Sequence, residues 1–441
     1  MIVGLGETGM SCARYFKRHG IPFSVVDGNP RPPNLASLRS LAPEVDVGPI
    51  DVDTLIQSDT IVVSPGVPLS TPEIQAALEA GVTVTGDVAI FAEEVTVPIV
   101  AITGSNGKST VTALVGKMVK DQNIAAGVGG NIGIPCLDLI DDENELYVLE
   151  LSSYQLETAN PLHCEVAVVL NLSPDHLDRY SSQQAYYQTK ASIYNAARKA
   201  VVNRDVKFDF NVSKAESVIT IGSDASPDNQ GFGLIRQRGQ TWLARGDELL
   251  LNVNDLGIKG THNQINALAA LAIGVHLQLD MTSMLNSLKA YRGLEHRCEL
   301  LGEHRKVTYF NDSKSTNIAS TEAAITGLAT EEGKNVILIL GGIDKGANFN
   351  ELIPAITQHV KEVVVYGRDA ESIASVIEQC AATRRCADLA EVVDCVVDDA
   401  RAGDVVLFSP ACSSFDMFDN FEHRGRIFKA LLKEKFGEGL S

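Results

Sequence analysis

The chain has 441 residues, a net charge of −19 and 45% hydrophobic residues. This length is typical of about three domains, and the apolar fraction is high enough for several buried cores. The acidic balance, with no long basic run, argues against a nucleic-acid or anionic-membrane partner. No apolar run approaches the ~20 residues of a membrane span, and the start MIVGLGETGM has no signal-peptide pattern. Eight scattered cysteines without a C-x-x-C pair indicate reduced thiols, so we expect a cytoplasmic protein.

Short apolar runs alternate with helical patterns along most of the chain, which is typical of parallel α/β sheets. The first block covers residues 1–87 and predicts a Rossmann-like domain. A first strand of this kind usually takes about five residues, so we expect part of it to precede Met1. The strands expected in this block are 2–3, 23–27 and 60–64.

The first turn of this block reads Gly4-x-Gly6-x-x-Gly9, with Asp27 about 20 residues further on. This spacing is typical of NAD binding, with the acidic residue on the ribose. Another phosphate-bearing nucleotide can use the same cradle. A second nucleotide loop further along the chain favours that alternative over a hydride-transferring enzyme.

The second block covers residues 88–293 and predicts a central, mostly parallel sheet. Alternating residues over 215–258 predict small antiparallel hairpins, and helical patterns cover 183–198 and 262–276. The third block, residues 294–441, predicts another Rossmann-like unit. The strands expected in these two blocks are 99–103, 147–150, 166–170, 306–311, 335–340, 362–366 and 404–408.

A glycine-rich loop follows the strand 99–103 and precedes a helix expected from about Thr110 to Lys120. Backbone N–H groups of such a loop bind phosphate, and the helix N-terminus adds partial positive charge. Lys108 is expected to reach the β- and γ-phosphates of ATP, and Ser109 to offer its hydroxyl to Mg²⁺. The alternative is a structural turn. The residues expected to bind the nucleotide here are Gly104, Ser105, Asn106, Gly107, Lys108, Ser109 and Thr110.

Two further polar residues follow strands of the second block. Glu150 ends the strand 147–150, where a carboxylate can reach a metal at the edge of the sheet. His176 follows the strand 166–170 and offers an imidazole ligand. The alternatives are a solvated carboxylate and an incidental loop histidine. Lys190, in the helical stretch 183–198, has no special status by spacing and is by itself a solvated helix lysine.

Taken in order, the motifs resemble those of the Mur ligases of bacterial peptidoglycan synthesis, over essentially the whole chain. The stretch at 409–425 resembles most closely that of the members that add D-glutamate. The matching stretches are GLGETG at 4–9, SPGVPL at 64–69, TGSNGKST at 103–110, GGNIG at 129–133, LELSSYQLE at 149–157, NLSPDHLDRY at 171–180, THNQINALAA at 261–270, GLEHRCE at 293–299, NDSKSTN at 311–317, LGGIDKG at 340–346 and SPACSSFDMFDNFEHRG at 409–425.

The resemblance implies three domains, for a UDP-sugar (1–87), for ATP (88–293) and for the incoming amino acid (294–441). It implies a monomeric ATP-dependent ligase that joins UDP-N-acetylmuramoyl-L-alanine to D-glutamate through an acyl phosphate. It also implies two Mg²⁺ sites: one at Ser109 and Glu150, the other at His176 and a Lys190 carbamylated by CO₂. The expected catalytic residues are Lys108, Glu150, His176 and Lys190.

The same resemblance assigns binding residues. Further ATP contacts are Asn263, Asn266, Arg297 and Asp312. The UDP-sugar and muramoyl-peptide contacts are Thr8, Asp27, Gly66, Asn131, Ser152 and Ser153. The D-glutamate contacts are Lys314, Thr316, Lys345, Ser414, Phe415 and Phe421.

Two alternatives remain open. A ligase of the same fold that adds another amino acid, or that adds glutamate to folate, would share the phosphate loop; the stretch 409–425 argues against it. A nucleotide-sensing regulator would bind ATP without turnover; the combination of Lys108, Glu150, His176 and Lys190 argues against that.

Overall fold

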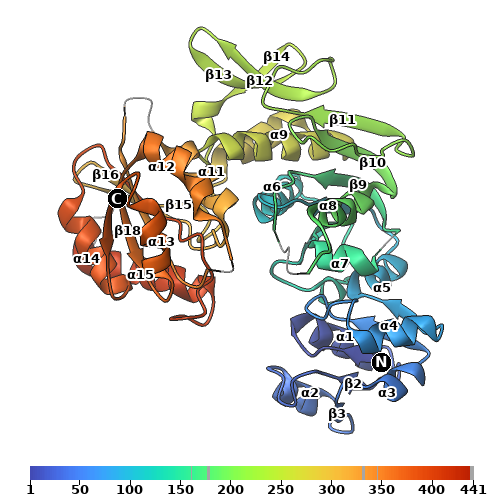
Figure 1. Ribbon diagram of the computed structural model, residues 1–441. Coiled ribbons are helices and arrows are strands. Elements are labelled where there is room, and N and C mark those ends of the chain that lie inside the picture. Colours follow the sequence, from blue (N-terminus) through green and yellow to red (C-terminus); the bar gives the residue numbers. More distant parts are fainter. Residues whose placement is uncertain (160, 176–178, 330–332, 345, 438–441) are drawn as a thin grey trace. The chain divides into compact units, whose positions relative to one another are not determined.

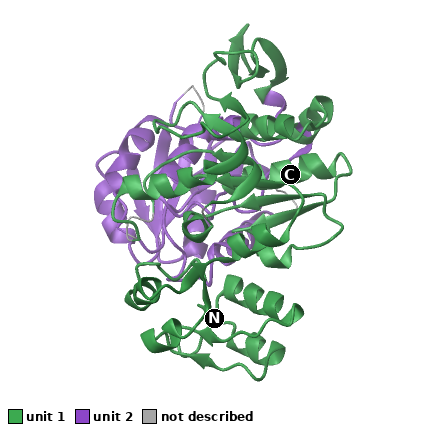
Figure 2. Cartoon of the chain, turned by 90° about the vertical axis from the view of Figure 1, so that its right-hand side faces the viewer, with its two compact units in different colours: residues 1–253, 266–288 green, residues 254–265, 289–441 purple. Residues whose placement is uncertain are grey.

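The computed structural model describes residues 1–159, 161–175, 179–329, 333–344 and 346–437 (Figure 1). Strands within these residues form four sheets, three of them wholly or mostly parallel, which confirms the α/β class. The chain divides into two compact units (Figure 2). The first holds residues 1–253 and 266–288, and the second holds 254–265 and 289–441. The boundaries at 87/88 and 293/294 remain predictions.

The first sheet has the strand order β3-β2-β1-β4-β5, and all its strands are parallel. This is a Rossmann-like order: β2 and β3 are added on one side of β1, and β4 and β5 on the other, so the strand order reverses between β1 and β4. Ligands of such sheets bind outside the carboxyl ends of the strands at this point. The elements are β1 (Ile2–Val3), α1 (Glu7–Arg18), β2 (Val25–Val26), α2 (Leu35–Leu41), β3 (Val47–Gly48), α3 (Val52–Ile56), β4 (Thr60–Val63), α4 (Pro72–Glu79), β5 (Thr83–Thr85) and α5 (Asp87–Glu94).

The second sheet is also parallel, in the order β11-β10-β9-β6-β8-β7. The elements up to its last strand are β6 (Ile99–Thr103), α6 (Lys108–Lys120), β7 (Ala126–Gly130), η1 (Cys136–Asp138), β8 (Leu146–Glu150), α7 (Ser153–Thr158), β9 (His163–Val169), α8 (Gln183–Ala191), η2 (Ser192–Tyr194), β10 (Ala196–Asn203) and β11 (Ser217–Ile221).

Two expectations for this region were wrong. The helix expected to reach 198 ends at Ala191, because the following residues enter β10 and bury Ala197, Ala200 and Val201 in the sheet. The range 215–258 is antiparallel only in its later part, since β11 joins the parallel sheet. The antiparallel sheet that does form has the order β12-β13-β14. Its elements and the next ones are β12 (Phe232–Gln237), β13 (Gln240–Arg245), β14 (Glu248–Asn252), η3 (Val253–Asp255), α9 (Thr261–His276) and α10 (Met281–Ala290).

The sheet of the second unit has the order β15-β16-β20-β17-β18-β19 and is parallel except for the β15–β16 hairpin. Its elements are β15 (Glu299–His304), β16 (Val307–Asn311), α11 (Ile318–Leu328), β17 (Val336–Gly341), η4 (Phe349–Leu352), α12 (Ile353–His359), β18 (Val360–Tyr366), α13 (Ala370–Ile377), β19 (Ala382–Arg385), α14 (Leu389–Asp399), β20 (Val405–Phe408) and α15 (Phe421–Phe436).

Alternate residues of the central strands β17 and β20 build two cores, one on each face of this sheet. Leu338 and Leu407 pack in the core that includes residues of α11, α12 and α13. Ile339 and Phe408 pack in the core that includes residues of α14 and α15. Because both faces are covered, these strands are continuous apolar runs, which is why the sequence pattern located them closely.

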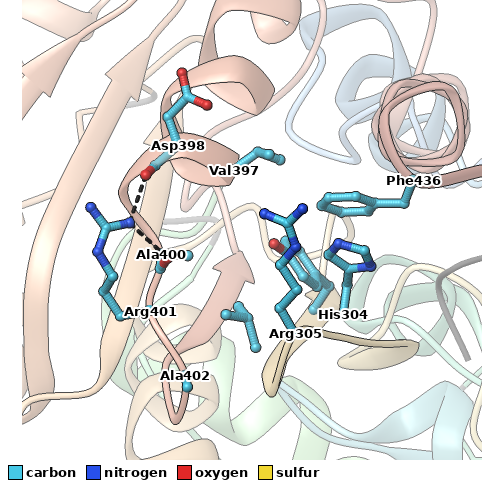
Figure 3. Close-up of a pocket in the computed structure, with 10 residues that line it drawn as sticks. His304, Arg305, Val397, Asp398, Ala400, Arg401, Ala402 and Phe436 are labelled. Atoms are coloured by element: carbon cyan, nitrogen blue, oxygen red, sulfur yellow. Dashed lines mark hydrogen bonds between the residues drawn. The ribbon is translucent and has the colours of Figure 1, made fainter.

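A hollow of about 380 Å³ lies at the amino-end edge of this sheet, between the β15–β16 turn and the end of α14 (Figure 3). Inside it, the His304 ring stacks on Phe436 with centroids 4.2 Å apart. Arg401 caps α14 by donating to the carbonyl oxygens of Asp398 (2.7 Å) and Ala400 (3.0 Å). None of the residues predicted to bind substrate lines this hollow.

Among the described residues, no helix is both long enough and apolar enough to cross a bilayer.

Candidate active site

The glycine-rich loop joins β6 to α6, and the helix begins at Lys108, two residues earlier than expected. Gly107 has a φ of 80°, and a Cβ at this position would lie 2.4 Å from the Asn266 side-chain oxygen. A side chain there would therefore both strain the backbone and collide with α9. The conformation places the start of a 13-residue helix directly after the loop, which suits the binding of an anion.

The loop is held in shape by the segment that follows β9. The Asn171 side chain accepts from the Asn106 N–H (2.8 Å) and donates to the Asn106 carbonyl (2.9 Å). The Ser105 hydroxyl donates to the Ser173 carbonyl (3.0 Å) and accepts from the Ser173 N–H (2.9 Å). These paired bonds hold the loop in one conformation, so it is preorganised.

Two lysine amines converge on the loop. Lys108 Nζ donates to the carbonyl oxygens of Gly104 and Ser105, both at 2.9 Å. Lys190 Nζ donates to the same Gly104 carbonyl, also at 2.9 Å, and the side chain is 2% exposed. Burial, and then the positive charge of Lys108, hold the pKa of the Lys190 amine well below its usual range. Lys190 is therefore not a solvated helix lysine.

Glu150 is 1% exposed at the end of β8, so it is not a solvated strand-end carboxylate. One of its oxygens accepts from the Ser109 hydroxyl, and the other accepts from the Asn131 side chain at 2.7 Å. Hard oxygen ligands of this kind suit Mg²⁺, which usually takes one or two carboxylates and keeps several waters. Ser109 and Glu150 thus fit a magnesium site at the start of α6.

The described residues provide no further group of metal ligands beside Ser109 and Glu150. Among them, no three His, Cys, Asp or Glu side chains are grouped so that they could hold a metal ion. His176, the other predicted ligand, lies outside the described residues. Of the two ligands predicted for the second metal site, the structure therefore describes only Lys190.

Ser152 and Ser153 lie where β8 turns into α7. The Ser152 hydroxyl accepts from the Gln155 N–H (3.2 Å) in a capping box, so it stabilises the helix start. Ser153 is buried. The capping bond gives Ser152 a structural role beside the predicted contact with the muramoyl-peptide.

Three residues predicted to contact the UDP-sugar follow β1, β2 and β4, where the strand order of the first sheet reverses: Thr8, Asp27 and Gly66. Leu5 N–H and Asn29 N–H each donate to the Asp27 carboxylate at 2.7 Å, which ties β2 to the glycine-rich turn. Thr8 lies in the first turn of α1. Gly66, in the turn after β4, has open space where a Cβ would stand. The position in this region where the backbone leaves no room for a side chain is Gly9, because a Cβ there would lie 2.0 Å from the Gly4 carbonyl oxygen.

In the second unit, predicted residues follow the carboxyl ends of neighbouring strands. Asp312, after β16, accepts from Cys298 N–H (3.0 Å) and from the Ser409 hydroxyl (2.8 Å). Burial raises the pKa of the Asp312 carboxyl to about 6. Lys314 Nζ lies 4.0 Å from the centre of the Phe421 ring, so two predicted D-glutamate contacts touch each other.

The remaining predicted residues of this unit differ in exposure. Ser414 is buried, whereas Phe415 is 68% exposed. Thr316 is half-buried, and Lys345 lies outside the described residues. Arg297 stands between two residues with positive φ, His296 (64°) and Cys298 (43°).

The two predicted nucleotide contacts on α9 are three residues apart. Asn263 donates to the Lys259 carbonyl (2.7 Å) and belongs to the second unit, whereas Asn266 belongs to the first. The predicted ATP contacts are therefore divided between the units.

Three family models match the chain in order. They describe a Mur ligase MurD-like N-terminal domain at residues 1–86, the Mur ligase middle domain at 102–274 and the Mur ligase glutamate ligase domain at 296–412.

The chain belongs to the Mur ligase family.

Individual relatives agree with this assignment. The chain is 46% identical to the UDP-N-acetylmuramoylalanine--D-glutamate ligase of Pseudomonas aeruginosa over 437 residues, which are 98% of this chain and 97% of the relative. It is also 46% identical to the ligase of the same name from Pseudomonas savastanoi pv. phaseolicola, over 97% of this chain and 96% of that one. Among solved structures, UDP-N-acetylmuramate-alanine ligase MurC from Thermotoga maritima shares the fold, with a TM-score of 0.62 and 19% identity over 98% of this chain and 99% of that one.

Sequence reasoning gave no role to several residues that support the site of this Mur ligase. Asn171 and Ser173 hold the phosphate loop. Arg179 donates to the carbonyl oxygens of Pro65 (2.8 Å) and Val67 (3.3 Å), and so holds the turn that contains Gly66. Asn171 and Ser173 could have been found from the sequence, because they are polar residues that follow a buried strand. Nothing in the local pattern indicates Arg179.

Proposed function

We propose that this Mur ligase joins D-glutamate to UDP-N-acetylmuramoyl-L-alanine and converts ATP to ADP and phosphate. The observation that carries the proposal is the identity of 46%, over 98% of the chain, to a ligase named for this reaction. The burial of the Lys190 amine beside the phosphate loop supports it, because binding of Mg-ATP alone does not call for a second, buried amine there.

The reaction has two steps. A carboxylate oxygen of the muramoyl-alanine attacks the γ-phosphorus of ATP, the bond to the β-phosphate oxygen breaks, and ADP leaves. The amine of D-glutamate then attacks the acyl carbon, phosphate leaves with the bonding electrons, and the amine loses a proton. Activation is required because a free carboxylate has no good leaving group. The protein contributes mainly by positioning groups and by stabilising charge.

Residues of the first unit are assigned to the phosphoryl group. Loop residues 104–110 hold the phosphates, and the Lys108 ammonium moves from the loop carbonyls to the β- and γ-phosphate oxygens. Mur ligases use ATP and Mg²⁺, and Ser109 and Glu150 would hold one ion. When bound, Mg²⁺ neutralises charge on the transferred phosphoryl group. Asn131 keeps the Glu150 carboxylate in orientation through its 2.7 Å hydrogen bond.

Lys190 is assigned a carbamate that, with His176, would hold a second Mg²⁺. Burial lowers the pKa of this amine, which increases the fraction that has a lone pair for CO₂. The N–C bond forms, one C=O π pair becomes the carboxylate charge, and the nitrogen loses a proton. This converts a buried amine into an oxygen ligand. Its role is to position the metal and not to act as a nucleophile.

The substrates and ATP are assigned to residues of all three predicted domains. Thr8, Asp27 and Gly66 line the site for the uridine diphosphate, and Asn131, Ser152 and Ser153 lie nearer the muramoyl-peptide. Asn263, Asn266, Arg297 and Asp312 contact ATP. Lysines and hydroxyls suit a dicarboxylate, so D-glutamate is assigned to Lys314, Thr316, Lys345, Ser414, Phe415 and Phe421. We place the reaction in the cytoplasm and the chain as a monomer.

The test is phosphate release from ATP with UDP-N-acetylmuramoyl-L-alanine and each of several amino acids. We expect release with D-glutamate and none with L-glutamate or diaminopimelate. Lys108→Ala is the control for a contaminating ATPase, and it should abolish release. Turnover with another amino acid but not with D-glutamate contradicts the substrate assignment. ATP binding without substrate-dependent turnover contradicts the assignment as an enzyme.

A further inference from the structure

Arg424 in α15 is the largest of the fully buried side chains, with an exposed fraction of 0%. Arginine is rarely buried unless its guanidinium donors find partners. Here they bond oxygens of three loops. Nε donates to the Ser313 hydroxyl (3.0 Å) and Nη2 to the Ser313 carbonyl (2.7 Å). Nη1 donates to the carbonyl oxygens of Cys412 (3.0 Å) and Gly341 (3.5 Å).

These loops follow three adjacent parallel strands. Ser313 comes after β16, Cys412 after β20 and Gly341 at the end of β17, and the sheet order places β20 between the other two. The carboxyl ends of parallel strands are where such sheets bind ligands. The guanidinium therefore ties together the loops that carry the predicted amino-acid contacts.

One of these bonds leads directly to predicted contacts. The Ser313 hydroxyl accepts from Arg424 and donates to the Phe421 carbonyl (2.8 Å). Lys314, the next residue after Ser313, lies over the Phe421 ring at 4.0 Å. Arg424 thus fixes, through Ser313, the relative position of a cation and the aromatic ring that it covers.

The loop after β20 also depends on an external restraint. Ala411 has a φ of 59°, a left-handed conformation that a non-glycine residue keeps only when its surroundings hold it. The next carbonyl, that of Cys412, is the one bound by Arg424. Ser413 is in turn bridged to Ile343 by backbone hydrogen bonds of 3.0 and 3.1 Å. Ser414 follows directly, so its position depends on the same restraint.

The start of α15 is itself docked closely on the sheet. A Cβ on Gly425 would lie 2.3 Å from His296 Nδ1, so glycine is required for this approach. The Asn311 side chain donates to the Gly425 carbonyl (3.3 Å). The backbone of Arg424 is therefore held at the same edge as the loops it bonds.

We propose that Arg424 is a positioning residue that sets the geometry of the amino-acid subsite by joining the loops at Ser313, Gly341 and Cys412. The inference rests on the proposed function, which places the amino acid at Lys314, Ser414 and Phe421. It predicts a selective effect, because Asp312, the predicted ATP contact, is held by Cys298 and Ser409 instead.

The experiment measures kcat and the three KM values for Arg424→Lys and Ser313→Ala. Lysine keeps the charge but lacks the planar fork, so it cannot join three loops. We expect the KM for D-glutamate to rise at least tenfold in both variants, with the KM for ATP and for the UDP-sugar changed less than twofold. Arg426→Met, an exposed arginine on the same helix, is the control and should match the wild type.

An unchanged KM for D-glutamate in folded variants overturns the proposal, as does an equal rise in all three KM values. If Arg424→Lys does not fold, Ser313→Ala decides, because it removes only a hydroxyl. If the wild type turns over a different amino acid, the proposed function fails. The role of Arg424 is then tested with the KM of that amino acid.

Discussion

Lys108 and Lys190 donate to the same acceptor, the carbonyl oxygen of Gly104, each at 2.9 Å. Two ammonium groups on one carbonyl repel each other strongly, and Lys190 has almost no contact with solvent. Burial and the charge of Lys108 therefore hold the pKa of the Lys190 amine well below its usual range, which favours the proposed reaction of this amine with CO₂.

The two lysines should respond differently to substitution. Lys190→Ala is expected to lower kcat at least a hundredfold, and an added short carboxylate such as acetate should restore part of it by replacing the carbamate. Lys108→Ala should lose activity without rescue, because a carboxylate cannot replace a cation on phosphate. The measurement is phosphate release at increasing acetate concentration. Full activity of Lys190→Ala, or equal rescue of both variants, contradicts the carbamate assignment.

Gly107→Ala is expected to weaken ATP binding at least tenfold, measured by titration calorimetry. The new methyl group meets the Asn266 side chain, and the backbone φ of 80° is strained for alanine. Gly81→Ala is the matched control, with a φ of 87° and no atom within 4 Å of the new Cβ. It should cost about 1 kcal/mol of stability and leave ATP affinity unchanged. Equal ATP affinity in Gly107→Ala would show that the loop tolerates a side chain there.

Asp87, the first residue of α5, should make stability fall as the pH rises. Burial raises the pKa of this carboxyl from 3.8 to about 6. Between about pH 4 and 6 the unfolded chain releases this proton while the folded chain keeps it, so the unfolded state is favoured as the pH increases. Asp87→Asn does not titrate and should be more stable than the wild type at pH 7.5 by about 3 kcal/mol, with little difference at pH 4.

This difference is measured by urea unfolding at both pH values. The fluorescence of Trp242 is the signal, since it is the one tryptophan of the chain and lies in the first unit. Asp53→Asn is the control, because Asp53 is an exposed residue in the first turn of α3. A stability difference for Asp87→Asn that is the same at pH 4 and pH 7.5 contradicts the assigned pKa.

The sequence by itself determined the architecture and the phosphate loop. The buried central strands are continuous apolar runs, so their positions followed from composition alone, as for 99–103. The loop at 104–109 could be predicted because its function requires particular residue types at neighbouring positions. Local patterns failed at residues 196–198: they continue a helical pattern, but they form the start of β10 and lie beside β9.

Only the tertiary structure decided which polar side chains are buried away from solvent. By spacing alone Lys190 resembles any helix lysine, and Arg424 resembles any arginine of a charged C-terminal helix. Their burial depends on segments far away in sequence: Lys190 meets Gly104, and Arg424 meets Ser313, Gly341 and Cys412. The physical reason is that desolvation and charge repulsion are set by what surrounds a group in space, and a linear pattern does not contain that information.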